Sequence, residues 1–298
     1  MNFFKNMSGE KYIFLELIFW SMFPIFSILT FSSIHPLYSA AFSTFLASVF
    51  FAIVITIKKK WNELLKKDIW KELIIATIII GIFFYSMTFI GLNMSTAGNM
   101  GIIFLMEVFF GFFFLGFLGK EKITLNGTIG AIIMVIGALI IFLPDVSKFG
   151  LGDLLLLIAI SVTPLGNFYQ KKIMKKISSS TLMFVRSFIS SIFIFLFALF
   201  FSKPPTYSQI LSSLFFLIPN GILFMGFSKV LWLEGIHRIP ITKAISIGTI
   251  TPMFTLFFSF LILGEIPSLW QIIGLFPMIL GAHLVLKTSK QNKGDVVE

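Results

Sequence analysis

The sequence contains no cysteine, and only three histidines are scattered along its 298 residues. The lack of cysteine excludes disulfide bonds and thiolate metal sites. The sequence also has neither the HExxH spacing of zinc hydrolases nor the glycine-rich loop that binds nucleotide phosphates. We therefore expect no metal and no cofactor, and we do not expect the chain to be an enzyme.

Charged residues are also scarce. They make up 12% of the chain and hydrophobic residues 57%, whereas a soluble domain carries about 25% charged residues. Ten mostly apolar stretches approach the roughly 20 residues that cross a bilayer as a helix, and lipid offers no partner to a bare backbone. The sequence predicts an all-α integral membrane protein with ten transmembrane helices. These cover approximately residues 12–31, 37–57, 70–92, 97–118, 125–143, 151–169, 181–201, 211–233, 241–263 and 269–286.

The few charges are unevenly distributed. Lysine and arginine total 23 against 13 acidic residues, and most of the basic residues fall in alternate connections between the apolar stretches. By the positive-inside rule, this bias predicts a multi-pass protein of the cell membrane with both termini in the cytoplasm. The same placement explains the net charge of +10, so we expect the lipid bilayer, and no nucleic acid, as a partner.

The two halves of the chain resemble each other. Aligning Glu121 with Glu265 sets an offset of 144 residues, at which Gly130 and Gly137 recur as Gly274 and Gly281. Five helices is an odd number, so the second half is expected to be inverted relative to the first. We assign residues 1–145 to the first five-helix repeat, 146–288 to the second, inverted repeat and 289–298 to a polar cytoplasmic tail. Inverted repeats are typical of alternating-access transporters, which bind solute near the midplane.

The four repeated glycines predict a helix contact. Gly130 and Gly137 are seven residues apart, as are Gly274 and Gly281, so each pair returns to nearly the same helix face. Small residues on one face allow two helices in lipid to approach closely. We expect the fifth and tenth helices to pack together within one chain. The alternative is that they form a dimer interface, and the sequence leaves open a monomer or a homodimer.

The ordered motifs resemble the drug/metabolite transporter superfamily, in particular its EamA family. The resemblance rests on TPMFTLFFSFLILGE from residue 251, EVFFGFFFLGFLGKE from residue 107, the Trp20-Ser21 pair and LWLEGIHRIPITKA from residue 231. It implies a metabolite transporter with a central cavity among helices 1, 3, 4, 6, 8 and 9. Solutes of this family include amino acids, nucleosides and sugars, most often exported, and proton coupling is one option. Ser21 stands in place of the usual glycine and Val108 in place of the usual proline, so the substrate stays open.

Glu107 lies near the middle of the fourth predicted helix. A carboxylate at the bilayer centre costs about 2.5 to 3.5 kcal/mol on insertion scales, so this side chain should face the interior of the helix bundle. Two interpretations remain open. Glu107 is either a site of proton exchange or a protonated, hydrogen-bonded strut between helices.

Three basic residues, Arg186, Lys229 and Lys243, lie within predicted spans and near one depth. One interpretation is that their flexible stems extend along the helices to the cytoplasmic surface. The other is a basic vestibule that favours solutes carrying a carboxylate or phosphate. Lys229 stands where the family usually has an aromatic residue, which the first repeat keeps as Tyr85.

Aromatic and amide side chains complete the candidate site, because a small amphipathic solute needs apolar walls and a few polar anchors. For each residue the alternative role is helix packing. The candidates for solute binding or coupling are Glu107, Trp20, Tyr85, Asn99, Asn167, Lys229, Trp232, Arg186 and Lys243.

The function predicted from the sequence is secondary active transport of small organic metabolites, such as amino acids, with export favoured and proton coupling an option. The first alternative is an integral-membrane enzyme acting on a lipid-linked molecule, against which the loops are too short to build an active site. The second is a channel or receptor, against which the inverted duplication argues.

Overall fold

The computed structural model describes residues 7–117, 125–142, 150–239, 244 and 247–294. Within these residues every regular element is a helix. Eight helical stretches are long and apolar enough to cross a membrane. Two shorter apolar helices, Leu125–Ile141 and Thr251–Leu263, lie where the fifth and ninth spans are predicted. The structure thus has helix within each of the ten predicted stretches, while the number that spans the bilayer stays a prediction.

The elements follow one another in two comparable series. The first comprises α2 (Gly9–Phe31), α3 (Pro36–Ile57), the short η1 (Trp61–Leu65) and η2 (Lys67–Ile69), α4 (Trp70–Ala76), η3 (Thr77–Phe84), α5 (Tyr85–Asn93), α6 (Ala97–Phe104), α7 (Met106–Phe117) and α8 (Leu125–Phe142). The second comprises α9 (Leu151–Ser161), α10 (Thr163–Ile173), α11 (Ser179–Phe201), α12 (Tyr207–Ile218), η5 (Pro219–Phe227), α13 (Ser228–Arg238), α15 (Thr251–Leu263) and α16 (Leu269–Gly294).

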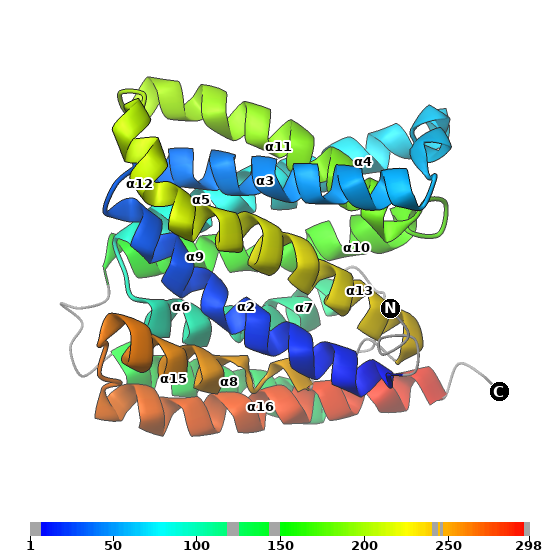
Figure 1. The fold of residues 1–298 in the computed structure, drawn as a ribbon. Helices are drawn as coiled ribbons and strands as arrows, with labels where there is room; N and C mark the ends of the chain where they lie inside the picture. The colour runs from blue at the N-terminus through cyan, green and yellow to red at the C-terminus, as the bar shows by residue number, and fades with distance from the viewer. Residues whose placement is uncertain (1–6, 118–124, 143–149, 240–243, 245–246, 295–298) are drawn as a thin grey trace.

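The helices run side by side, and two helix pairs enclose the rest (Figure 1). The pair α3 and α11 lies along one side, the pair α8 and α16 lies along the opposite side, and α2, α6, α9 and α13 lie between them. The described N-terminal and C-terminal ends are both at the right-hand end of Figure 1. This arrangement surrounds the central helices with protein on two sides, where polar groups can be buried away from lipid.

The contact between α8 and α16 depends on the four repeated glycines. A Cβ built on Gly130 would lie 2.7 Å from the Gly281 carbonyl oxygen, and one on Gly137 would lie 2.8 Å from the Gly274 carbonyl oxygen. These distances are shorter than real Cβ contacts. The two backbones therefore pack too closely for any larger side chain at these positions.

The two series also share an unusual backbone feature. The π-helical segments η3 and η5 occupy Thr77–Phe84 and Pro219–Phe227, which nearly coincide at the offset of 144 residues. A second shared feature is a glycine contact. Gly91 approaches Gly152 where α5 meets α9, and Gly235 approaches Gly9 where α13 meets α2. π-Helical turns are rare and occur often at functional sites.

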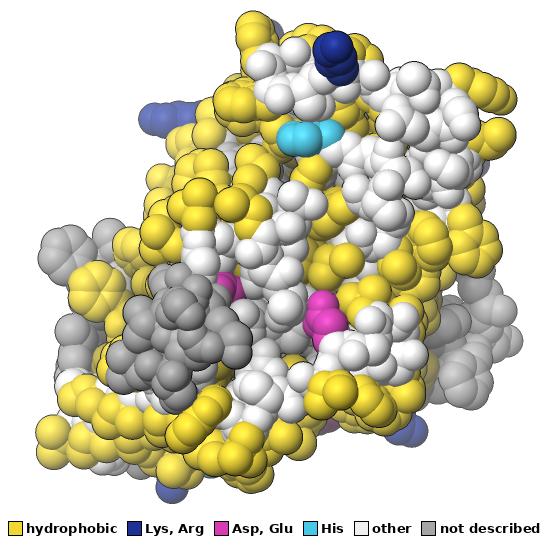
Figure 2. Space-filling view, turned by 90° about the vertical axis from the view of Figure 1, so that its left-hand side faces the viewer, with side chains coloured by type: hydrophobic (Ala, Val, Ile, Leu, Met, Phe, Trp, Pro, Cys, Tyr) yellow, Lys and Arg dark blue, Asp and Glu magenta, His cyan; other side chains and the backbone are white. Residues whose placement is uncertain are grey.

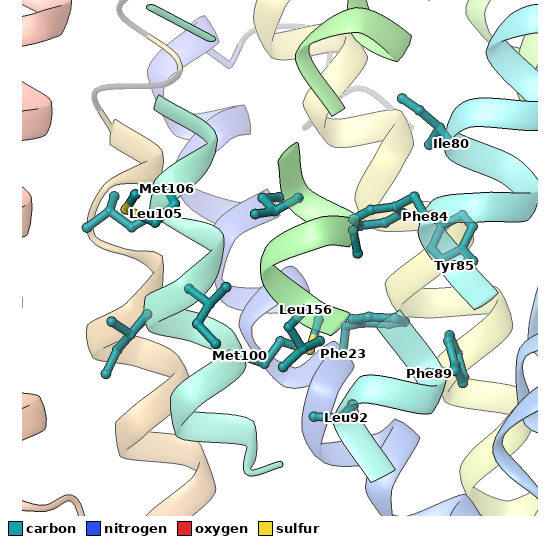
Figure 3. Close-up of a cluster of buried hydrophobic side chains, with 14 of the residues drawn as sticks. Phe23, Ile80, Phe84, Tyr85, Phe89, Leu92, Met100, Leu105, Met106 and Leu156 are labelled. Carbon is teal, nitrogen blue, oxygen red and sulfur yellow. The ribbon is translucent and has the colours of Figure 1, made fainter. Parts of the chain in front are cut away.

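Two helices of the central layer are interrupted. The fourth predicted span is broken at Leu105 into α6 and α7, and the sixth is broken at Val162, just before Pro164, into α9 and α10. Pro164 has no backbone N–H to donate, so an unbroken helix across Val162 is disfavoured. Apolar side chains fill the space nearby, and Figure 3 shows Phe23, Tyr85 and Phe89 close together in this core. The polar groups described next lie in this setting of broken helices and aromatic side chains.

Candidate functional site

An ion pair joins α2 to α13. Lys229 Nζ lies 3.0 Å from Glu16 Oε1, and the two side chains are only 15% and 6% exposed. The same ammonium lies 3.2 Å from the centre of the Trp20 ring, a cation–π geometry. The Ser228 hydroxyl donates to Glu16 Oε1 at 3.2 Å. The charge of Lys229 is therefore matched by a carboxylate and covered by an aromatic face.

A second carboxyl group lies at the break in the fourth span. Glu107, half-buried in the first turn of α7, accepts a hydrogen bond of 2.9 Å from Asn167 Nδ2 of α10. The Thr163 hydroxyl, at the start of α10, donates to the backbone carbonyl of Ile160 at 2.8 Å. The breaks at Leu105 and Val162 thus lie beside the residues that face each other here.

A chain of amide groups leads from Glu107 to Arg186. Gln170 Nε2 donates to Asn167 Oδ1 at 3.0 Å, and an Arg186 Nη donates to Gln170 Oε1 at 2.7 Å. Every donor in this chain points toward Glu107. The guanidinium carbon of Arg186 lies 5.9 Å from the centre of the Tyr85 ring.

These groups form one electrostatic neighbourhood, which we call the charged core: Glu16, Glu107, Arg186 and Lys229. Lys229 attracts and Glu16 repels a negative charge on Glu107, and Arg186 repels the charge of Lys229. With all four groups ionised the charges cancel. Buried charges are costly unless they are paired or hydrogen-bonded, and such groups inside a membrane usually belong to a solute or ion pathway.

The structure brings together six of the predicted site residues in and around the charged core: Trp20, Tyr85, Glu107, Asn167, Arg186 and Lys229. Lys229 turns to Glu16, and the Arg186 side chain is 4% exposed. The interpretation that these two stems extend to the cytoplasmic surface is therefore wrong for both. Trp232 instead packs against an apolar cluster that includes Ile69 and Ile173. Lys243 lies outside the described residues.

Asn99 belongs to a different polar group. It lies in the first turn of α6, whereas Glu107 lies just beyond the last residue of that helix. The Asn99 amide donates to Asp153 Oδ1 at 3.1 Å and accepts from Gln271 Nε2 at 2.7 Å. Nearby, Glu265 accepts from the backbone amides of Ala97 and Gly98, both at 3.4 Å. Asn99 thus helps to join the start of α6 to the start of α9 and α16.

A small open pocket of about 70 Å³ adjoins this second polar group, and its lining includes Thr96, Glu265 and Gln271. Figure 2 shows the end of the molecule at the left of Figure 1, where polar and acidic surface lies between apolar margins. The turn between α15 and α16 is at this end. The pocket is separate from the charged core, because the two share no residue.

Glu16 and Gln170 were not predicted as site residues. Gln170 lies three residues after Asn167, the spacing of neighbours on one helix face. This spacing could have predicted from the sequence that the two amides lie together. Among the described residues, no cluster of His, Asp and Glu could hold a metal ion.

This architecture defines the class of the protein. The described residues form apolar helices in two comparable series around a charged core, which is the organisation of a multi-pass membrane protein. The profile of the EamA-like transporter family matches twice, over residues 7–143 and 150–287. Because these matches cover most of the chain, the protein belongs to the EamA-like transporter family, of the drug/metabolite transporter kind.

The chain also resembles individual proteins. It is 22% identical over 264 residues to "Uncharacterized transporter YoaV" of Bacillus subtilis (strain 168), which covers 87% of this chain and 90% of that protein. A solved crystal structure aligns with a TM-score of 0.68 and 14% identity, covering 95% of this chain and 98% of the other. At that identity the likeness concerns the fold alone.

Proposed function

We propose that this protein is a secondary transporter that exports small organic metabolites, amino acids or related solutes, across the cytoplasmic membrane. It works by alternating access between two inverted five-helix repeats, with both chain termini in the cytoplasm. One observation carries the proposal: the contacts of the charged core cross between the repeats. Glu16 pairs with Lys229, Glu107 accepts from Asn167, and Tyr85 faces Arg186.

This arrangement suits alternating access because each contact joins one residue before position 145 to one after position 150. A relative movement of the repeats would change these contacts. A solute bound among them would therefore be sensed by both halves. The broken helices beside Glu107 resemble the discontinuous spans around which transporters build their sites.

The direct test is counterflow in proteoliposomes. Vesicles containing the purified protein are preloaded with one unlabelled amino acid or other metabolite, and accumulation of the same labelled solute is followed. We expect transient accumulation that exceeds equilibrium for at least one solute and is absent from protein-free vesicles. The absence of accumulation across amino acids, nucleosides, sugars and organic acids would contradict the proposal.

A further inference from the structure

Arg186 is a buried cation, and no carboxylate among the described residues pairs with it. Its side chain is 4% exposed, and in the part of the chain that the structure describes no ion pair includes it. Its guanidinium makes a single hydrogen bond there, to Gln170, and its Nε has none. A buried donor that makes no hydrogen bond is costly, and a bound ligand is one way in which such a donor is satisfied.

The other buried cation does not share this property. Lys229 already has a carboxylate at 3.0 Å and a tryptophan ring at 3.2 Å. A ligand anion at Lys229 would have to compete with Glu16, which lies on a neighbouring helix and cannot diffuse away. Of the two cations, Arg186 is the one with unused binding capacity.

The hydrogen bonds of the amide chain also determine which edge of the Arg186 guanidinium remains available to a ligand. Gln170 occupies one Nη of Arg186 at 2.7 Å and is itself held by Asn167. The edge containing Nε has no recorded partner among the described residues. A guanidinium edge presents parallel N–H groups that match the two oxygens of a carboxylate.

We propose that Arg186 binds the carboxylate of the transported solute through its Nε edge, so that the substrates are small organic carboxylates, including zwitterionic amino acids. The proposal rests on the proposed transport function and deepens it. With the charged core balanced, one carboxylate adds a single negative charge, whereas a phosphate would add up to two. The buried rings of Tyr85 and Phe23 pack against each other, and the Tyr85 ring lies 5.9 Å from the Arg186 guanidinium carbon.

The test compares carboxylates with the corresponding amides, in which the carboxylate group is replaced by a neutral one, on the purified full-length protein. The probe pairs are benzoate with benzamide, butyrate with butyramide, and L-leucine with L-leucinamide. Ligand that binds the folded state raises the unfolding temperature. We expect at least one carboxylate to raise it while its amide does not. Equal shifts within every pair, or no shift from any carboxylate, would overturn the proposal, as would stabilisation by phenylphosphate alone.

Variants test whether Arg186 is the residue that binds the carboxylate. Arg186→Gln should weaken binding of the stabilising carboxylate at least tenfold, and Arg186→Lys should restore it only in part because an ammonium lacks the fork geometry. Gln170→Glu serves as the second variant in case Arg186→Gln fails to fold. It places a carboxylate beside the guanidinium as an internal competitor and should also weaken binding. Undiminished carboxylate binding in any folded variant with Arg186 replaced would overturn the assignment.

Transport measurements distinguish the carboxylate assignment from the proposed transport function on which it rests. If wild-type vesicles carry only uncharged solutes and Arg186→Gln leaves that transport unchanged, the protein is a transporter and the carboxylate assignment is wrong. If carboxylates bind through Arg186 but no solute shows counterflow, the binding site stands and the transport function is wrong.

Discussion

Tyr85 and Lys229 occupy equivalent positions in the two repeats, and they carry different chemistry. Tyr85 directly follows the π-helical segment η3, and Lys229 lies two residues after the last residue of η5. The Tyr85 ring faces the guanidinium of Arg186 at 5.9 Å, while Lys229 forms a salt bridge of 3.0 Å with Glu16. The repeats thus share a backbone design and differ in charge. In this transporter, a shared backbone design therefore surrounds a charged core whose two sides are not alike.

The difference has an energetic consequence. On the Lys229 side, cation and anion are both supplied by the protein, so removing one leaves the other buried and unpaired. On the Arg186 side, the protein supplies the cation, a polar amide and an aromatic ring, with no carboxylate in contact among the described residues. Mutations on the Lys229 side should therefore affect stability most.

The largest expected effect is that of Glu16→Gln. This change leaves the Lys229 ammonium buried beside an uncharged amide, and breaking a buried ion pair costs about 3 to 5 kcal/mol. Denaturant unfolding in detergent micelles should show that loss, and the double variant Glu16→Gln/Lys229→Met should recover most of it. Glu234→Gln is the matched control, because the exposed pair of Glu234 with Arg238 is worth at most about 1 kcal/mol. Equal losses of unfolding free energy for Glu16→Gln and Glu234→Gln would contradict the claim that mutations on the Lys229 side affect stability most.

The second effect concerns a region where the repeats are alike. Gly281→Val inserts a side chain where a built Cβ already meets Met134 Cγ at 2.7 Å, and overpacking costs about 1 to 3 kcal/mol. Thermal unfolding should show this loss. Gly111→Val is the control, since a Cβ there meets nothing within 4 Å. A control loss as large as that of Gly281→Val would remove the close-packing explanation.

The third prediction tests whether Glu107 exchanges protons. Glu107→Gln keeps an oxygen to accept from Asn167 but cannot titrate. If the carboxyl group takes up and releases a proton during transport, the variant should lose the pH dependence of counterflow, roughly a tenfold change between pH 5.5 and 8 in the wild type. A wild-type pH profile in the variant would assign Glu107 to helix packing.

The smallest effect is expected at Glu63, in the connection between α3 and α4. Burial raises the pKa of its carboxyl group, but hydrogen bonds from Ser178 and Thr181, together with Lys60, lower it from 4.5 to about 2. Because the pKa is lowered by folding, the stabilisation is complete above pH 4.5 and is lost as the pH falls toward 2.

Glu63→Gln should therefore reduce the free energy of unfolding by about 1 kcal/mol at neutral pH, a discounted value for a partly solvated group. The difference from the wild type should narrow between pH 4.5 and 2 in unfolding measurements. A difference that stays constant over this range would mean that the carboxylate charge contributes nothing.

The sequence was sufficient to predict the class of fold, because apolar length and charge placement depend on the solvent and not on tertiary contacts. It also predicted that Gly130 and Gly281 lie on packing faces, which is where the structure places them. Which polar residues meet was harder to predict. Glu16 and Lys229 are over 200 residues apart, and their contact depends on how α2 crosses α13. Spacing along a helix cannot reveal such a pair.

The account's central claim is that Arg186 is available to a carboxylate whereas Lys229 is already neutralised by Glu16. The most direct test is an experimental structure with the most stabilising carboxylate bound. We predict carboxylate oxygens within hydrogen-bond distance of Arg186 Nε and an intact pair between Glu16 and Lys229. A carboxylate bound to Lys229, with Glu16 displaced and Arg186 unoccupied, would contradict the claim.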